Sequence, residues 1–144
     1  MQLRPYQFDA VNAVYDYYLS GKTGNVIAAM PTGTGKSLVV AAIVKRALFE
    51  YPGIRVLMLT HVKELIEQNY AKLKELWSSA PVGVYSASVG IKQTGFPIMY
   101  AGVQSLRDKA HLLGHIDLCV IDECHLVSHK EETTYVKLHI HYHF

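Results

Sequence analysis

The chain has 144 residues, of which half are hydrophobic and 18% are charged, and its formal net charge is +2. This composition excludes a disordered chain, and the length is sufficient for one domain with a substantial core. The net charge is too small to indicate nucleic-acid binding by itself. No apolar run reaches the roughly 20 residues that cross a bilayer, so no membrane partner is expected. The N-terminus also lacks the apolar segment of a signal peptide.

The chain has two cysteines, Cys119 and Cys124. They are too few for a disulfide framework or a zinc site. Their number therefore favours a reduced, cytoplasmic protein.

The first half of the chain is predicted to alternate helices with apolar strands. Apolar residues at helical spacing follow Pro5, and the pattern stops at Gly21. The elements expected next are a strand over Asn25–Met30, a helix over Lys36–Phe49, a strand over Arg55–Thr60 and a helix over Val62–Trp77.

The second half continues the alternation. Its expected elements are strands over Val82–Tyr85 and Pro97–Ala101 with a loop over Ser86–Gly95 between them, a helix over Ser105–Leu113 and a strand over Ile116–Ile121. The strands at 55–60 and 116–121 are almost continuously apolar, which is typical of strands buried on both faces of a parallel sheet. The pattern predicts a three-layer α/β domain with a mainly parallel central sheet.

Residues 30–37, Met-Pro-Thr-Gly-Thr-Gly-Lys-Ser, lie between a strand candidate and a helix candidate. Such a loop can cradle nucleotide phosphates, because its glycines turn backbone N–H groups toward one centre and the helix N-terminus adds partial positive charge. Lys36 is expected to reach the β/γ oxygens and the Ser37 hydroxyl to ligate Mg²⁺. Met30 stands where the usual spacing has a glycine, so a glycine-rich turn before a core helix is the alternative.

Two adjacent acids, Asp122 and Glu123, directly follow the last strand candidate. Ligands bind at the carboxyl edge of an open α/β sheet, and buried acids need a partner. A magnesium nucleotide would supply that partner. Asp122 would then hold Mg²⁺ directly or through water, and Glu123 would orient and deprotonate the attacking water. A solvated acidic turn is the alternative.

Together these motifs resemble the first RecA-like domain of superfamily 2 helicases, the DEAD/DEAH-box group, with Asp-Glu-Cys-His at 122–125 as a DECH version of the second motif. The resemblance covers residues 3 to about 127 and implies a three-layer P-loop NTPase (RecA-like) fold. Residues 29–37 are similar to motif I of this group, where the first glycine is often absent, which explains Met30. The Leu-Arg-Pro-Tyr-Gln start and the His-Val-Lys-Glu-Leu segment look closest to bacterial RadD-like DNA-repair ATPases and restriction-enzyme motor subunits.

The resemblance also implies roles for individual residues. Residues 3–7 look like the adenine-recognition motif, in which a glutamine amide pairs with the base edge. Residues 59–68 look like motif Ia and residues 100–106 resemble the following strand-binding motif, both of which touch the sugar–phosphate backbone. The implied catalytic residues are Lys36, Asp122 and Glu123, with Ser37 and Asp122 on Mg²⁺. The implied nucleotide ligands are Arg4, Gln7, Thr32, Gly33, Thr34, Gly35, Lys36 and Ser37. The implied nucleic-acid contacts are Thr60, His61, Lys63, Gly102, Gln104 and Ser105, and His125 would couple the nucleotide site to the neighbouring motif.

Plainer interpretations compete at the weaker motifs. Glutamine is usually a surface residue and threonine a common N-cap. The alternatives are an exposed helix residue at Gln7, an ordinary cap and solvated first turn at Thr60, His61 and Lys63, a plain cap before a short helix at Gln104 and Ser105, and a satisfied histidine in a polar cluster at His125.

The resemblance ends early. After His125 the group's first domain continues through a helix and a strand ending in Ser/Thr-Ala-Thr, a motif that the sequence lacks. Residues 1–134 are therefore expected to form an incomplete ATP-binding domain, truncated at its C-terminal end, and residues 135–144 an atypical tail. The second RecA-like lobe, which in the group supplies the arginine fingers, is not expected within these 144 residues. The tail alternates apolar residues with histidines, so a metal site at His139, His141 and His143 is the alternative to a truncation or frameshift after about Tyr135.

The expected function is that of the ATP-binding lobe of an ATP-dependent DNA helicase or translocase. ATP and Mg²⁺ are the expected cofactors, and DNA is the expected partner in preference to RNA. With a second lobe present the protein would couple ATP hydrolysis to movement on nucleic acid, whereas the isolated chain would hydrolyse ATP poorly. The alternative is a nucleotide-binding fragment or non-catalytic binding module without helicase activity.

Overall fold

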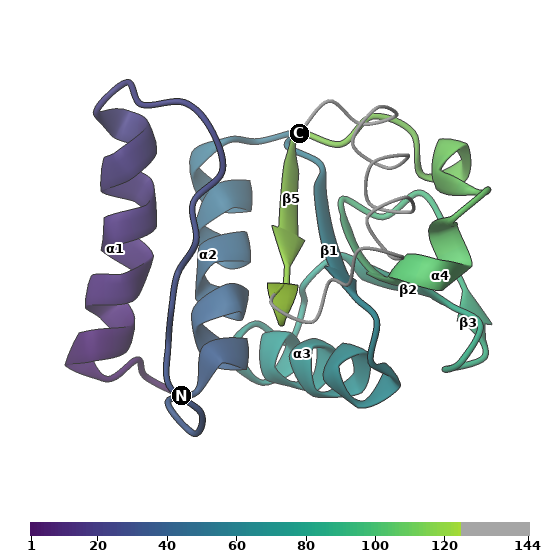
Figure 1. Cartoon of the computed structure of the whole chain (residues 1–144), viewed down its shortest axis with the longest axis horizontal. Helices are drawn as coiled ribbons and strands as arrows, with labels where there is room; N and C mark the ends of the chain where they lie inside the picture. The colour runs from purple at the N-terminus through teal and green to yellow at the C-terminus, as the bar shows by residue number, and fades with distance from the viewer. Residues whose placement is uncertain (125–144) are drawn as a thin grey trace.

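A five-stranded sheet forms the centre of the computed structural model, which describes residues 1–124 of the chain (Figure 1). The strands are β1 (Val56–Thr60), β2 (Val82–Ser86), β3 (Ile91–Lys92), β4 (Ile98–Gly102) and β5 (Leu118–Ile121). Their spatial order is β3-β2-β4-β1-β5, and all neighbours are parallel except β2 and β3. The predicted α/β class with a mainly parallel sheet is confirmed.

Helices pack on both faces of this sheet. The helices are α1 (Pro5–Leu19), α2 (Lys36–Glu50), α3 (Lys63–Leu76), α4 (Val103–Leu106) and the 3₁₀ helix η1 (Ala110–Leu113). Apolar residues of α2 and α3 share one core with one face of the sheet, and those of α4 and η1 share a second core with the other face. Helix α1 packs against α2 at the edge of the domain (Figure 1). The three predicted layers are therefore present.

The central strand β1 shows why a continuous apolar run belongs in the middle of such a sheet. Successive side chains of a strand point to opposite faces. Val56 and Met58 lie in the core under α2 and α3, whereas Leu57 and Leu59 lie in the core under α4 and η1. All five residues of β1 are buried, as predicted. β5 is only half-buried, contrary to the expectation of a fully buried strand, because it is the edge strand of the described sheet.

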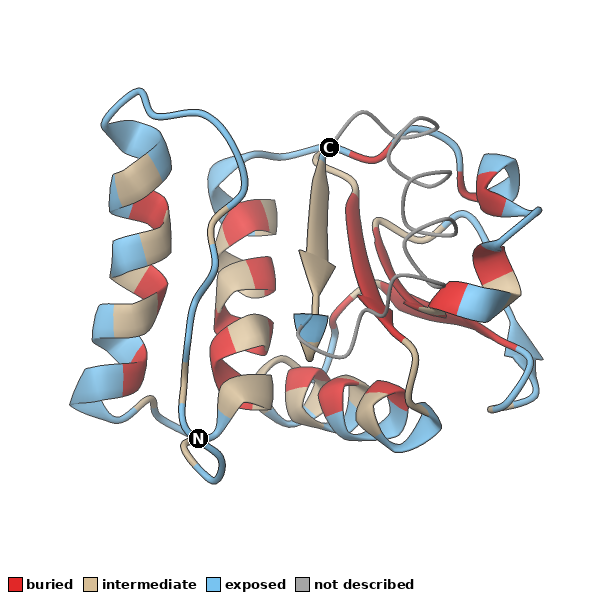
Figure 2. Ribbon diagram, in the orientation of Figure 1, coloured by how far each residue is buried: buried red, intermediate tan, exposed pale blue. Residues whose placement is uncertain are grey.

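The predicted strand over Asn25–Met30 is wrong. The segment has no regular secondary structure and is largely exposed between α1 and α2, with Ile27 77% exposed (Figure 2). A strand needs a neighbouring backbone to bond with. Here a cavity of about 610 Å³, lined by residues 26–32 and 118–124, separates the segment from β5. The local pattern is that of a strand, but no described strand lies alongside it.

Two smaller differences concern the chain between β2 and β5. The predicted loop at 86–95 contains β3, which pairs antiparallel with the end of β2. The predicted helix at 105–113 is divided into α4 and η1 by a turn of three exposed charged residues at 107–109. Within residues 1–124, each helix is too short or too polar to cross a membrane. The predicted tail at 135–144 lies outside the described residues.

Asp117 joins the beginnings of β1 and β5. Its Oδ2 accepts a hydrogen bond from the Arg55 backbone N–H at 2.8 Å, and its Oδ1 lies 2.7 Å from His115 Nε2. The bond from Arg55, aided by His115, holds the pKa of the Asp117 carboxyl below its usual 3.8. A lowered pKa in the folded state stabilises the fold above the unfolded pKa, and that stability is lost as pH falls through the folded pKa.

Replacing this carboxylate should make the fold less stable in a pH-dependent way. Asp117→Asn should lower the free energy of unfolding at pH 7 by less than about 1 kcal/mol, because solvent screens a partly exposed carboxylate. Urea unfolding should show the difference shrinking once pH falls below about 4. Asp108→Asn, on the exposed turn, is the control. If Asp117→Asn lost as much stability below about pH 4 as at pH 7, this role of Asp117 would be contradicted.

Candidate active site

The carboxyl ends of the parallel strands bring the predicted functional segments to one edge of the sheet. Thr60 at the end of β1 is in register with Gly102 at the end of β4. Asp122 follows β5, and its N–H donates to the Leu59 carbonyl at 3.0 Å. Lys36 at the start of α2 reaches the same edge, where its Nζ lies 2.6 Å from Glu123 Oε1.

The loop before α2 has the backbone of an anion cradle. Gly33 and Gly35 both have φ of +79°, a conformation that L side chains rarely adopt. Gly35 is the N-cap of α2, and among the described residues no side chain caps that end of the helix. The first N–H groups of a helix have no partner within it, so this end offers donors and partial positive charge to an anion. The loop therefore fits a phosphate group.

The ion pair between Lys36 and Glu123 links the two predicted motifs. Their side chains are 31% and 19% exposed. The hydrogen bond to Glu123 raises the pKa of Lys36, so this amine stays charged. Glu123 has φ of +53° and is the one non-glycine residue with positive φ in the part that the structure describes. Such backbone strain in a non-glycine residue is typical of functional sites.

Asp122 is buried, which contradicts the alternative of a solvated acidic turn at this residue. Its Oδ1 accepts the Glu123 N–H at 2.9 Å, and its Oδ2 accepts from Asn69 Nδ2 at 2.9 Å. Sequence reasoning missed Asn69. The available signal was its position between Ile66 and Leu73, at the spacing of the apolar stripe of the predicted helix.

The oxygen donors at this edge fit a magnesium ion bound with a nucleotide. Ser37, half-buried in the first turn of α2, supplies a hydroxyl, and Asp122 supplies a carboxylate. Mg²⁺ is usually held by one or two such side chains together with substrate phosphates and water. Within residues 1–124 there is no cluster of three His, Cys, Asp or Glu side chains that would hold a metal by itself. A shared site of protein and phosphate oxygens is therefore the arrangement that these residues support.

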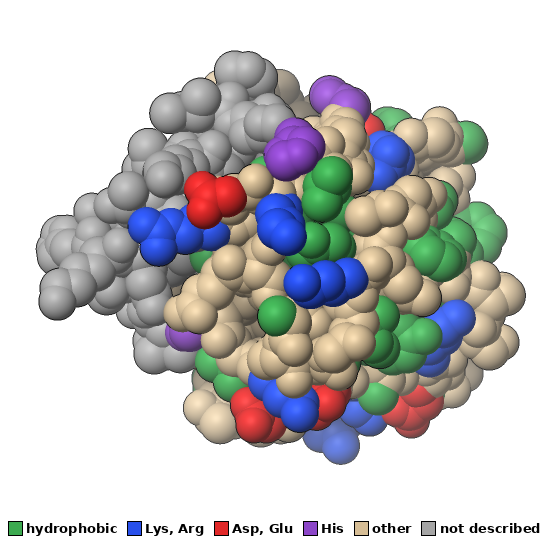
Figure 3. Space-filling model, turned by 90° about the vertical axis from the view of Figure 1, so that its right-hand side faces the viewer, with side chains coloured by type: hydrophobic (Ala, Val, Ile, Leu, Met, Phe, Trp, Pro, Cys, Tyr) green, Lys and Arg blue, Asp and Glu red, His purple; other side chains and the backbone are tan. Residues whose placement is uncertain are grey.

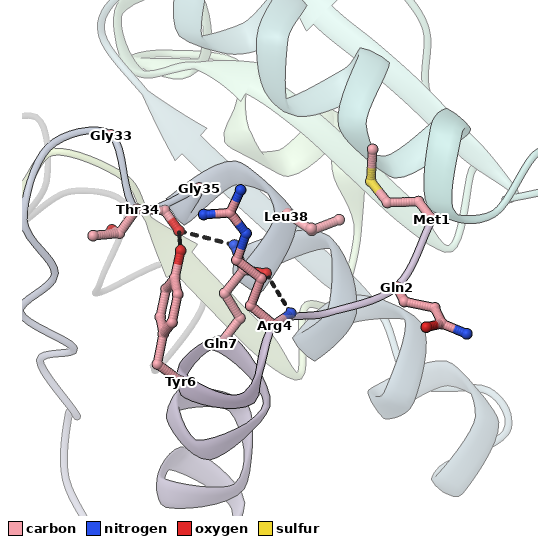
Figure 4. A pocket seen from close by; sticks show the side chains of 9 residues that line it. All are labelled: Met1, Gln2, Arg4, Tyr6, Gln7, Gly33, Thr34, Gly35 and Leu38. Carbon is pink, nitrogen blue, oxygen red and sulfur yellow. Dashed lines mark hydrogen bonds between the residues drawn. The ribbon is translucent and has the colours of Figure 1, made fainter.

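A second, smaller cavity of about 260 Å³ lies between the N-terminus and the loop (Figure 4). Gln7 is only 4% exposed, so the interpretation as an exposed helix residue is wrong. Its Nε2 donates to the Thr34 carbonyl at 2.8 Å, and its Oε1 accepts the Arg4 N–H at 2.9 Å. Tyr6 Oη donates to the same Thr34 carbonyl at 3.1 Å. These bonds attach the start of α1 to the glycine loop.

The structure divides the predicted nucleotide ligands between the two cavities. Those on the smaller cavity are Arg4, Gln7, Gly33, Thr34 and Gly35. Those on the larger cavity are Thr32 and Lys36, beside the predicted catalytic acids Asp122 and Glu123. Ser37 lines neither cavity. A side chain at Gly35 would be strained at its φ of +79°, and its Cβ would lie 2.5 Å from Gln7 Nε2, so the Gln7 amide would have to shift.

The predicted nucleic-acid residues differ in accessibility. Lys63 and Gln104 are exposed, whereas Thr60 is fully buried and does not bring its hydroxyl to the surface. Val62 and Gly102 are the N-caps of α3 and α4, so the cap interpretations of Thr60 and of Gln104 and Ser105 are wrong.

The side chains of Thr60 and Ser105 instead accept hydrogen bonds from backbone N–H groups, of Val62 at 3.3 Å and Ala87 at 2.9 Å. His61 is half-buried, and its Nδ1 has no hydrogen-bond partner in the described part of the chain. His125 lies outside the described residues. On the face to the right in Figure 1, basic side chains are scattered among acidic and apolar ones (Figure 3).

Comparison with known proteins identifies a family, and this chain is also similar to a curated protein and to a solved structure among others. Residues 1–144 match the family described as "Type III restriction enzyme, res subunit". The mouse (Mus musculus) "ATP-dependent RNA helicase DHX58" is 27% identical, over 87% of this chain and 20% of its own length. A solved structure of a nuclease-deletion mutant of the Type ISP restriction-modification enzyme LlaGI, in complex with a DNA substrate mimic, is similar with a TM-score of 0.69 and 17% identity.

The match with the solved structure covers 96% of this chain and 16% of the solved chain, and this likeness shows the fold. This chain spans about a fifth of the length of the mouse protein. Together the comparisons confirm the predicted first RecA-like domain of a superfamily 2 helicase.

The ion pair at this edge should compete with an incoming phosphate for Lys36. Glu123→Gln removes the negative partner and should tighten ADP binding without Mg²⁺ by up to about fivefold, because such an ion pair contributes about 0.2–1 kcal/mol. Calorimetric titration in EDTA measures this change. Glu50→Gln, which breaks the Arg46–Glu50 ion pair elsewhere on α2, is the matched control. Weaker binding in Glu123→Gln, or equal gains in both variants, would contradict the competition.

Proposed function

This chain belongs to the family of Type III restriction enzyme res subunits, and we propose that it is the ATP-binding lobe of an ATP-dependent DNA helicase or translocase. The observation that carries the proposal is the contact of Lys36 with Glu123 at 2.6 Å, beside the buried Asp122. A cation at the start of a helix, a glycine loop and paired acids at a strand end are the parts that phosphoryl transfer from ATP requires.

Each of these residues then has a defined role. Backbone N–H groups at Gly33–Ser37 bind the phosphates, and Lys36 exchanges Glu123 for the β/γ oxygens. Ser37 and Asp122 would hold Mg²⁺, which would supply positive charge to neutralise those oxygens. Glu123, released from Lys36, orients and deprotonates the attacking water. Arg4, Gln7 and Thr32 complete the nucleotide site. Gln7 would pair with the adenine edge through the second Nε2 hydrogen and the second Oε1 lone pair, which its bonds to Thr34 and Arg4 do not use.

The nucleic-acid partner that we propose is DNA in preference to RNA. A structural neighbour was solved with a DNA substrate mimic, whereas the mouse relative is named as an RNA helicase. The exposed Lys63 and Gln104, with His61, Gly102, Ser105 and the backbone at Thr60, would contact one strand at the carboxyl edge. Phosphate contacts of this kind weaken steeply as salt increases.

We propose that residues 1–134 belong to an ATP-binding domain of the DEAD/DEAH-box group and that the sequence of residues 135–144 is atypical of that group. His125 would couple the nucleotide site to the neighbouring motif. The two free thiols, Cys119 and Cys124, support a reducing, cytoplasmic setting. Turnover by this lobe alone should be slow, because arginine fingers from a second lobe contribute about 10³–10⁵ in rate. A nucleotide-binding module without turnover is therefore the second candidate.

Loss of the loop lysine should weaken nucleotide binding. Lys36→Ala removes the mobile cation on the β/γ phosphates and should weaken Mg-ADP binding by about 2–5 kcal/mol, as truncation of a charge pair does. Calorimetric titration provides the measurement, and Lys45→Ala on the same helix is the control. Equal affinity in wild type and Lys36→Ala would remove the basis of the proposed function.

Loss of the Gln7 amide should abolish base selectivity. Gln7→Ala should bring ATP and GTP affinities together, because an unmatched buried polar group costs about 1–3 kcal/mol in the intact site. Tyr6→Phe removes the other side-chain bond to Thr34 and keeps Gln7, so it separates loop anchoring from base recognition. An unchanged ATP/GTP ratio in Gln7→Ala would restrict Gln7 to the anchoring role.

A further inference from the structure

Asn69 is a fully buried polar residue on the inner face of α3, in the interior between that helix and the sheet. Its Nδ2 lies 2.9 Å from Asp122 Oδ2 and 3.9 Å from Met58 Sδ. An ionised carboxylate only accepts hydrogen bonds, so the amide nitrogen of Asn69, not its oxygen, has to face Asp122. The orientation of the Asn69 side chain is therefore fixed by its partner.

Packing alone does not explain an asparagine at this position. Its Oδ1 is buried and has no hydrogen-bond partner in the described part of the chain. A buried acceptor without a partner costs free energy, whereas a leucine of similar size would fill the same space without that cost. What Asn69 provides and leucine cannot is the donor to Asp122.

That donor completes the support of the Asp122 carboxylate. The Glu123 N–H binds Oδ1 and Asn69 binds Oδ2, so both oxygens are held from different parts of the chain. Hydrogen bonds of this kind orient the carboxylates that ligate metals and tune their affinity. We propose that Asn69 is a positioning residue that fixes Asp122 for the Mg²⁺ of the nucleotide site, an inference that rests on the function proposed above.

The test compares ADP affinity with Mg²⁺ and with EDTA in the full chain, measured by calorimetric titration. Asn69→Leu keeps the volume and removes the donor, and Asn69→Ser keeps a polar group that is too short to reach Asp122. Glu75→Leu, at an exposed position of the same helix outside the motif at 59–68, is the matched control. Circular dichroism and thermal unfolding establish which variants are folded, and Asn69→Ser decides the outcome if Asn69→Leu does not fold.

In the Asn69 variants the gain in ADP affinity from Mg²⁺ should fall by about 10-fold or more, while the affinity in EDTA stays at the wild-type value. Glu75→Leu should keep the full gain. The inference is overturned if folded Asn69 variants keep the wild-type gain, or if they lose affinity equally with and without Mg²⁺, which would indicate a structural role. Wild-type protein that binds no ADP, or binds it without any effect of Mg²⁺, would instead overturn the proposed site itself.

Discussion

The parallel register around β1 is the constraint on which the site depends. β1 is bonded on one side to β4 and on the other to β5, and parallel strands end at the same edge of a sheet. That register places Asp122 beside the end of β1, where the Lys36 amine meets Glu123 at 2.6 Å. The apolar cores on both faces hold the register, because a shift by one residue would exchange the side chains between them.

The glycine loop, in contrast, is held from outside the sheet. Gln7 and Tyr6 both donate to the Thr34 carbonyl, and Gly35 leaves room for the Gln7 amide. The loop is thus anchored to α1 on one side and continues into α2 on the other. On the sheet side, Asn69 from α3 holds Asp122. Because α3 also begins with Lys63, one helix carries both a proposed nucleic-acid contact and the support of the metal-binding carboxylate.

The long periodic elements could be predicted from the sequence because their pattern is local. The helices at α1, α2 and α3 and the strands β1 and β4 agree with prediction to within one or two residues at each end. The prediction of a strand over Asn25–Met30 failed because a strand needs a neighbouring strand to bond with, and the residues of the segment do not indicate whether one is present. Asn69 was missed for a related reason, since its contact with Asp122 spans 53 positions of the chain.

The glycine loop and the end of β5 together form the proposed nucleotide site. Backbone amide NMR spectra of the ¹⁵N-labelled chain, recorded during titration with Mg-ADP, test it most directly. The largest shifts should fall together on Gly33, Gly35, Lys36 and Ser37 and on Asp122 and Glu123. Shifts confined to the loop with none at Asp122 or Glu123, or centred on β3 and η1, would contradict it.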